Sequence, residues 1–190
     1  ATSWWSISEF NVLTDGSSAG SGGSGGSGSG GGSSGGAGGT GGGSSSLAID
    51  CAGPGATPYV ADTDFTGGSV NNHANTIDVS GVTNPAPAVV YQTNRLGTFS
   101  YTIPGFAAGS SHTVRLHFAE TFFSTAGSRT FNVSINGSQM LTNFDIFAAA
   151  GAKNKAIVKP FTVNANASGA YVIQVTSVVN NSLLAAVEIQ

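Results

Sequence analysis

Two adjacent aromatic residues, Phe122 and Phe123, stand where a strand-like stretch of the sequence ends. Residues 124–127, which follow them, have the composition of a loop. Neighbouring side chains on extended backbone point to opposite faces, so at least one of the two rings is expected to be partly exposed. An exposed ring beside a loop is suited to stacking on the apolar C–H face of a sugar, with nearby polar side chains binding the hydroxyl groups. The alternative is a rim contact that closes one end of the fold.

The carboxylates offer little to a catalytic mechanism. Those of residues 47–190 are Asp50, Asp62, Asp64, Asp78, Glu120, Asp145 and Glu188. Glycoside hydrolysis needs two carboxylates that flank the scissile bond, and each of these has an ordinary structural alternative. Glu188, between Val187 and Ile189, is expected to face outward. No HxH, HExxH or CxxC pattern occurs, and residues 47–190 contain no GxSxG nucleophile elbow, so the sequence predicts that the chain is not itself an enzyme.

Asp62 and Asp64 are separated by one residue in a turn-rich stretch. Aspartates in turns commonly accept hydrogen bonds from nearby backbone amides, and this is the interpretation that we favour. A structural calcium ion, bound by carboxylates and backbone carbonyls, is the alternative. No cofactor is otherwise predicted.

Charged side chains are scarce in this chain. The 190 residues include six Lys and Arg and nine Asp and Glu, which is 8% of the total and a formal net charge of −3. A typical soluble domain has about 25%. Nucleic-acid binding requires clustered cations, so it is not expected. No apolar run approaches the ~20 residues that cross a membrane, so a membrane partner is not expected either. A nearly neutral surface favours an uncharged partner.

A stretch at residues 16–46 divides the chain. It contains 17 of the 29 glycines, together with 11 serines, and has no charged residue. Such a segment buries too little apolar surface to offset its ordering entropy, so we predict a flexible linker of 31 residues. Residues 47–190 remain as a single domain that is large enough to bury a core.

Residues 1–15 are predicted to form an orphan strand. Their apolar members are Trp4, Trp5, Ile7, Phe10, Val12 and Leu13. The alternation breaks at Ser8 and Glu9, which indicates a bulge or a strand buried on both faces. A single strand is not stable alone in water. It therefore either docks on a sheet, where strand addition between copies would give oligomers, or closes a preceding module.

Short β-prone runs separated by Gly, Pro, Asn and Ser fill the rest of the chain. We expect strands at residues 47–51, 89–92, 98–103, 112–120, 130–135, 156–163, 170–176 and 184–189, with a return strand that begins at 139–141. Asn136 and Gly137 predict a tight hairpin because both tolerate positive φ. Residues 146–152 are expected to form a short helical turn that ends at Gly151. The pattern predicts an all-β sandwich of the jelly-roll type.

The single cysteine, Cys51, has no partner for an intrachain disulfide. We interpret it as a small apolar residue on a buried strand. The Gly/Ser segment and the low Lys content are typical of secreted modular proteins, so we expect an extracellular location.

Six motifs occur in one order along residues 47–190: YVADTDFTGG at 59–68, VYQTNR at 90–95, FSYTIP at 99–104, VRLHFAE at 114–120, RTFNVSING at 129–137 and NFDI at 143–146. This series resembles the malectin and malectin-like carbohydrate-binding family. The resemblance implies a galactose-binding-like jelly-roll β-sandwich that binds glucose-containing oligosaccharides without catalysis. Bacterial members of that family are modules of secreted polysaccharide-degrading enzymes. Residues 3–12 separately resemble the closing strand of discoidin-like sugar-binding modules.

The resemblance also implies a binding site, with several departures. The family's aromatic pair matches Phe122 and Phe123, although Phe122 stands where Tyr is usual. Leu96 replaces another aromatic residue. The implied polar contacts are His73, Asn94, Arg95 and Asn180, of which Asn94 and Asn180 replace carboxylates and His73 replaces a loop aromatic.

The sequence thus favours a non-catalytic carbohydrate-binding module for glucose-containing oligo- or polysaccharides. It would be tethered to neighbouring modules of a secreted protein. The alternative is a structural, adhesion or assembly module without a sugar site, for which the orphan strand and Leu96 are the supporting features.

Overall fold

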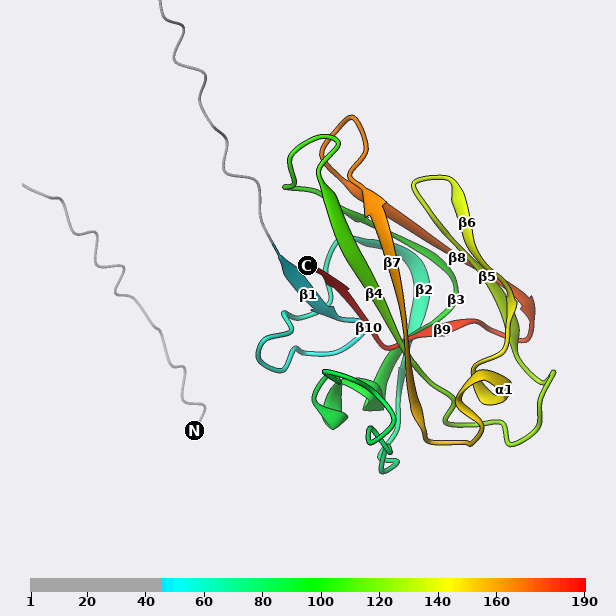
Figure 1. Ribbon diagram of the computed structural model, residues 1–190. Helices are drawn as coiled ribbons and strands as arrows, with labels where there is room; N and C mark the ends of the chain where they lie inside the picture. The colour runs from blue at the N-terminus through cyan, green and yellow to red at the C-terminus, as the bar shows by residue number, and fades with distance from the viewer. Residues whose placement is uncertain (1–45) are drawn as a thin grey trace, which may run out of the picture. The chain divides into compact units, whose positions relative to one another are not determined.

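The computed structural model describes residues 46–190, so the predicted strand at 1–15 and the predicted linker up to residue 45 lie outside the described residues. Strands make up about half of the described chain (Figure 1). The elements in order are β1 (Leu47–Asp50), β2 (Phe65–Asn72), the 3-10 helix η1 (Ala88–Gln92), β3 (Thr93–Ile103), β4 (Ser111–Ala119), β5 (Thr130–Ile135), β6 (Ser138–Phe144), α1 (Ile146–Ala150), β7 (Ala156–Asn164), β8 (Tyr171–Val179), β9 (Leu183–Leu184) and β10 (Ala186–Ile189).

Two antiparallel sheets face each other and confirm the predicted all-β sandwich. One sheet has the order β1-β10-β4-β7, and the other has the order β2-β3-β8-β5-β6, with β9 paired to β3. In Figure 1 the long strands β4 and β7 cross the layer that contains β2, β3 and β8. Within residues 46–190, no helix is long and apolar enough to cross a membrane.

The main core lies between the sheets and follows from the alternation in β4. Val114, Leu116 and Phe118 are fully buried, as their spacing predicts. Phe118 contacts Phe131 of β5 with ring centroids 5.7 Å apart, and Phe144 of β6 with centroids 5.2 Å apart. These large side chains make burial between the layers the main stabilising contribution.

A second buried cluster covers the opposite face of β4 and corrects one predicted element. The predicted strand at residues 89–92 is wrong, because this stretch forms η1. Val90 N donates to Pro87 O at 2.9 Å, which closes a helical turn directly after the proline. Val90 and Tyr91 are fully buried, and Tyr91 OH lies 2.8 Å from His117 Nδ1. The four-stranded sheet is therefore covered on both faces over part of its area.

Glu188 lies beneath this cover, so the prediction that it faces outward is wrong. It is 7% exposed, because the loop that carries Tyr59 packs over β10. Tyr59 OH and the Arg115 guanidinium both donate hydrogen bonds to its carboxylate, and His117 Nε2 lies 3.5 Å from it. Burial alone would raise the pKa of Glu188, but the nearby His117, the hydrogen bond from Tyr59 and the Arg115 charge lower it to about 2.

This carboxylate makes the stability of the protein sensitive to acid. The unfolded chain takes up a proton at Glu188 near its ordinary pKa of 4.5, whereas the folded chain does so only near about 2. We therefore expect the unfolding free energy to fall between these two pH values, by up to about 3 kcal/mol. Urea denaturation of the wild type and of Glu188→Gln at pH 7, 4.5 and 3 measures this. The same drop in both proteins would contradict the assignment.

The predicted hairpin and the predicted helical turn are both confirmed. Asn136 and Gly137 have φ values of 48° and 80° between β5 and β6. Asn136 also accepts from Val172 N at 2.8 Å through Oδ1 and donates to Asn164 O at 2.9 Å through Nδ2. Gly151 ends α1 in the left-handed conformation, with φ of 79°.

Strand β2 is absent from the predicted elements because its sequence contains two glycines and few β-formers. Gly67 and Gly68 have φ values of 79° and 69°, and a bulge interrupts the pairing with β3 there. A Cβ on Gly68 would lie 2.9 Å from Arg95 Cγ and 3.1 Å from Leu96 O. These glycines therefore permit the backbone of β2 to lie close to β3, and β2 forms one edge of its sheet.

Cys51 is fully buried, as expected, and burial raises the pKa of its thiol. It belongs to the main core together with Ile49 and Tyr101.

Candidate functional site

A cavity of about 480 Å³ opens between the loops at one end of the sandwich. Its wall combines the end of β2 and the residues after it with β3, the loop after β4, the residue before β5 and the loop after β8. The lining residues are Asn71, Asn72, His73, Asn75, Leu96, Thr121, Phe122, Phe123, Arg129, Asn180 and Asn181.

The aromatic pair forms the apolar part of this cavity. Phe122 is 72% exposed and Phe123 is half-buried, which confirms that at least one ring is exposed. The ring centroids lie 4.9 Å apart and the planes make an angle of 84°. This edge-to-face geometry is favourable for aromatic pairs and leaves the Phe122 ring open to a ligand.

Glu120 positions the two rings from below. Its carboxylate is 1% exposed, and Oε1 accepts hydrogen bonds from Phe122 N at 2.9 Å and Phe123 N at 3.0 Å. The other oxygen, Oε2, accepts from Arg129 Nε at 2.6 Å. A buried carboxylate with charged and backbone partners is a strong local restraint, so the backbone that carries the aromatic pair is fixed.

Arg129 connects this restraint to the opposite wall of the cavity. Its guanidinium carbon lies 5.1 Å from the Phe123 ring centroid, and Nη1 donates to Asn181 O. Sequence reasoning did not identify Arg129 as a site residue. The sequence nevertheless contained an indication. Arg129 begins the 129–137 motif and Glu120 ends the 114–120 motif, so two opposite charges stand near each other in a chain with few charged residues.

His73 supplies an imidazole to the cavity. Its Nε2 lies 3.4 Å from Asn94 Nδ2, and its Nδ1 is buried without a hydrogen-bond partner in the described part of the chain. Burial lowers the pKa of His73, so the ring is neutral at pH 7. Asn94 is 1% exposed, lies behind His73 and accepts from Asn71 Nδ2 at 3.1 Å. Asn94 therefore supports the cavity wall and is not on its surface.

Asn180, which the resemblance gives as a polar contact, lines the cavity. It has a φ of 55°, and its Nδ2 donates to Ser128 O at 2.7 Å. The structure thus brings together His73, Phe122, Phe123 and Asn180 of the six predicted site residues.

Arg95 does not reach the cavity, which corrects its predicted role as a direct contact. It is 3% exposed and lies with its guanidinium carbon 3.3 Å from the Phe65 ring centroid. It donates to Asp62 and to Gly67 O, the latter at 2.9 Å. The physical reason is strand alternation, since Arg95 follows Asn94 on β3 and points to the other side.

Asp62 is a partner of Arg95 and of the core. Its Oδ1 accepts from Tyr101 OH at 2.7 Å, so its oxygens bind side chains and not the turn amides that the sequence suggested. Within residues 46–190, no group of three or more His, Cys, Asp or Glu side chains gathers to hold a metal ion.

The cavity is electrically balanced. Among the described residues that line it there is no carboxylate, and the charge of Arg129 is matched by Glu120 directly behind it. What remains is a set of amides, a hydroxyl and a neutral imidazole, which both donate and accept hydrogen bonds. Such a surface is suited to a neutral ligand with many hydroxyl groups.

The Malectin domain family matches residues 45–188 of the chain. The chain belongs to the malectin domain family. This match confirms the resemblance noted in the sequence. Malectin domains are non-catalytic carbohydrate-binding domains. The cavity with the aromatic pair is thus the candidate sugar site of a malectin domain.

Two relatives illustrate the settings in which malectin domains occur. A probable LRR receptor-like serine/threonine-protein kinase of Arabidopsis thaliana is 35% identical over 82 residues, which are 40% of this chain and 8% of the kinase. Malectin of Homo sapiens is 34% identical over 70 residues, which are 36% of this chain and 24% of human malectin. The chain spans less than a quarter of either relative.

Solved structures share the fold at low identity. The ANX2 ectodomain from Arabidopsis thaliana superimposes with a TM-score of 0.65 and 18% identity, over 75% of this chain and 48% of that one. Bacteroides uniformis beta-glucuronidase gives a TM-score of 0.60 and 17% identity, over 76% of this chain and 18% of the enzyme. At these identities the likeness concerns the fold alone.

Proposed function

We propose that this malectin domain binds a neutral, glucose-containing oligo- or polysaccharide in the cavity beside Phe122 and Phe123, without catalysing a reaction. The observation that carries the proposal is the exposed Phe122 ring, which stands at the rim of an electrically balanced, amide-lined cavity. A sugar C–H face stacks on this ring, while His73 and Asn180 bind hydroxyl groups. Asn94 acts indirectly by holding His73 in place.

The polar lining favours an uncharged glycan over an acidic one. Arg129 is the cation at the cavity; its Nε and Nη1 donate to Glu120 and Asn181 O, and Glu120 balances its charge. A uronate carboxylate would therefore lose its bound water without finding an unpaired cation as its counter-charge, which is unfavourable. Neutral hydroxyl groups pay a smaller desolvation cost, because the asparagine amides can both donate hydrogen bonds to them and accept hydrogen bonds from them in place of water.

The setting that we propose is a secreted protein with several modules. A Gly/Ser linker of 31 residues would have a root-mean-square span of roughly 30 Å. Tethering at this range raises the effective concentration of a weak binding site near a neighbouring module. The chain then acts as an accessory binding module, whether its neighbours are enzymatic or structural.

Leu96→Tyr tests this assignment by a gain of affinity. Leu96 lies half-buried in the cavity wall, at the position where the family resemblance implies an aromatic residue. A second ring there is expected to tighten glucan binding about three- to ten-fold through stacking. Affinity electrophoresis in gels that contain the glucan measures the change. Leu96→Met, which keeps the wall aliphatic, is the matched control and is expected to bind like the wild type. An unchanged affinity in a folded Leu96→Tyr protein would place the sugar elsewhere.

A further inference from the structure

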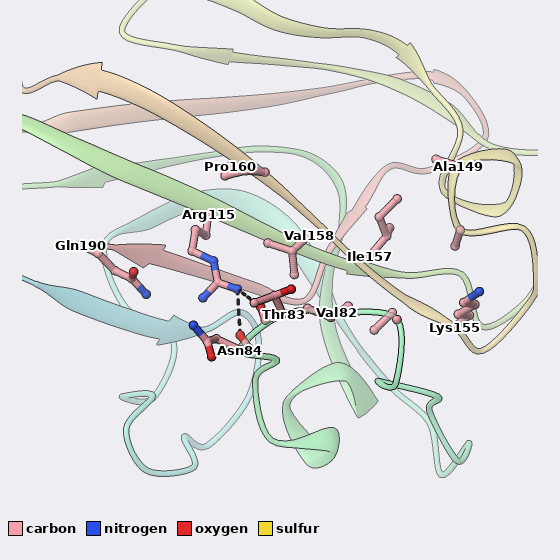
Figure 2. Close-up of a pocket in the computed structure, with 13 residues that line it drawn as sticks. Val82, Thr83, Asn84, Arg115, Ala149, Lys155, Ile157, Val158, Pro160 and Gln190 are labelled. Carbon is pink, nitrogen blue, oxygen red and sulfur yellow. Dashed lines mark hydrogen bonds between the residues drawn. The ribbon is translucent and has the colours of Figure 1, made fainter.

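A second cavity, of about 520 Å³, lies on the outer side of the four-stranded sheet (Figure 2). Loop residues 81–84 form one of its walls. Its floor is aliphatic and comes mainly from Val82, Val158 and Pro160. It shares no lining residue with the cavity beside Phe122. It is therefore a separate surface that the proposed sugar site does not use.

Two cations stand at opposite ends of this groove (Figure 2). Arg115 is fixed at one end, where Nη2 donates to Thr83 O and Asn84 O at 2.8 Å each. Glu188 compensates the Arg115 charge from behind. Lys155 stands at the other end, half-buried, and its ammonium has no ion pair within residues 46–190. Lys155 is thus a cation of the groove without a direct ion-pair partner among the described residues.

Asp78 is the acidic residue that acts on Lys155 through space, but its side chain is engaged elsewhere. Its Oδ1 accepts hydrogen bonds from Ser80 N at 2.9 Å and from Ser80 Oγ at 2.6 Å. Its backbone forms a short parallel bridge with Lys155, and Ala156 N donates to Asp78 O at 2.8 Å. The chain itself therefore already pairs an extended segment with the first residues of β7.

Beyond that bridge the edge of β7 is open. β7 is the last strand of its sheet, and no strand in the described range pairs with its other side. Thr113 of β4 stands opposite Thr162 of β7. Both backbone groups of Thr113 are hydrogen-bonded to Gln190, at 2.9 and 3.0 Å, and so point away from β7. The backbone N–H and C=O of Thr162 therefore point away from β4, toward the open side. By alternation, Val158 and Pro160 do the same. Proline fits there because no donor is required of it on the β4 side, and on the open side it presents its carbonyl oxygen but no N–H.

We propose that this groove binds an extended peptide segment of a partner protein that carries an acidic side chain. The segment would pair with the Val158 and Thr162 backbone, lay apolar side chains on the aliphatic floor and direct its carboxylate to Lys155. Edge pairing supplies affinity through the main chain, and the groove supplies selectivity through side chains. A glycan fits less well, because none of the described lining residues is aromatic and stacking is absent.

Selection from a phage-displayed library of random heptapeptides on the full 190-residue chain tests this proposal. Recovered peptides are expected to contain Asp or Glu. Their synthetic forms, measured by fluorescence anisotropy, are expected to bind Lys155→Met about ten-fold more weakly than wild type. Replacing the acidic residue of the peptide with its amide is expected to have the same effect. Lys153→Met, which removes an exposed lysine two residues earlier, is the matched control and is expected to bind normally.

The location is checked separately by following backbone amide signals during titration with the best peptide. Val158 and Thr162 are expected to shift, and the amides of Phe122 and Phe123 are expected to stay in place. Peptides without an acidic residue, equal binding to folded Lys155→Met, or no recovery above the Lys155→Met background would each overturn the proposal. Lys155-dependent binding of trigalacturonate without any peptide would overturn it in favour of an acidic glycan.

Discussion

Phe122→Ala is expected to weaken glucan binding about 30-fold while the fold remains intact. The ring is 72% exposed and contacts Phe123 by its edge, so its removal takes away little buried surface. A central aromatic contact to a ligand contributes about 2 kcal/mol or more, which corresponds to this loss. The unfolding free energy is expected to change by no more than about 0.5 kcal/mol. Titration calorimetry and thermal melting measure the two quantities.

Phe122→Tyr is the matched control for this prediction. It keeps the ring and adds a hydroxyl group at an exposed position, so glucan affinity is expected to be retained or improved. Phe123→Ala is less diagnostic, because Phe123 is half-buried against Arg129 and its loss also disturbs the wall. Binding that survives Phe122→Ala would argue for the rim-contact interpretation of the aromatic pair.

Glu120→Ala is expected to have the largest effect on stability, a loss of about 3–5 kcal/mol in unfolding free energy. Arg129 is 6% exposed, so removing its partner leaves a buried guanidinium without a counter-charge. The amides of Phe122 and Phe123 lose their acceptor at the same time. Urea denaturation measures the stability, and glucan titration of the protein that remains folded is expected to show weakened binding as well.

A double-mutant cycle isolates the ion pair in this prediction. Glu120→Ala combined with Arg129→Ala removes both charges, so the loss is expected to be clearly smaller than the sum of the two single losses. Additive losses would mean that Glu120 and Arg129 act independently and that the aromatic pair is held by other contacts.

The features that sequence analysis predicted correctly are those with local causes. The exposure of Phe122 follows from two adjacent aromatic residues at a strand end. The hairpin at Asn136 and Gly137 and the end of α1 at Gly151 follow from residues that tolerate positive φ. Strand alternation in β4 identified one face of the core without any tertiary information.

The features that were missed depend on contacts between distant parts of the chain. β2 forms a strand because β3 offers an edge, although Gly67 and Gly68 weaken its local preference. Glu188 is buried because a loop more than a hundred residues earlier covers it. Arg95 and Asn94 are consecutive in the motif, yet one faces Asp62 and the other supports His73. The motif alone does not reveal which of them approaches a ligand.

The central claim is that this malectin domain binds a neutral glycan beside its aromatic pair. Calorimetric titration of the full chain against glucans, xylans, galactans and glucose disaccharides tests it most directly. The account predicts binding to a glucose-containing member of the panel, without release of products and with loss of binding in Phe122→Ala/Phe123→Ala. Failure of the folded wild type to bind any member, or binding that the double variant retains, would contradict the account. The first of these results would favour a structural or adhesion module.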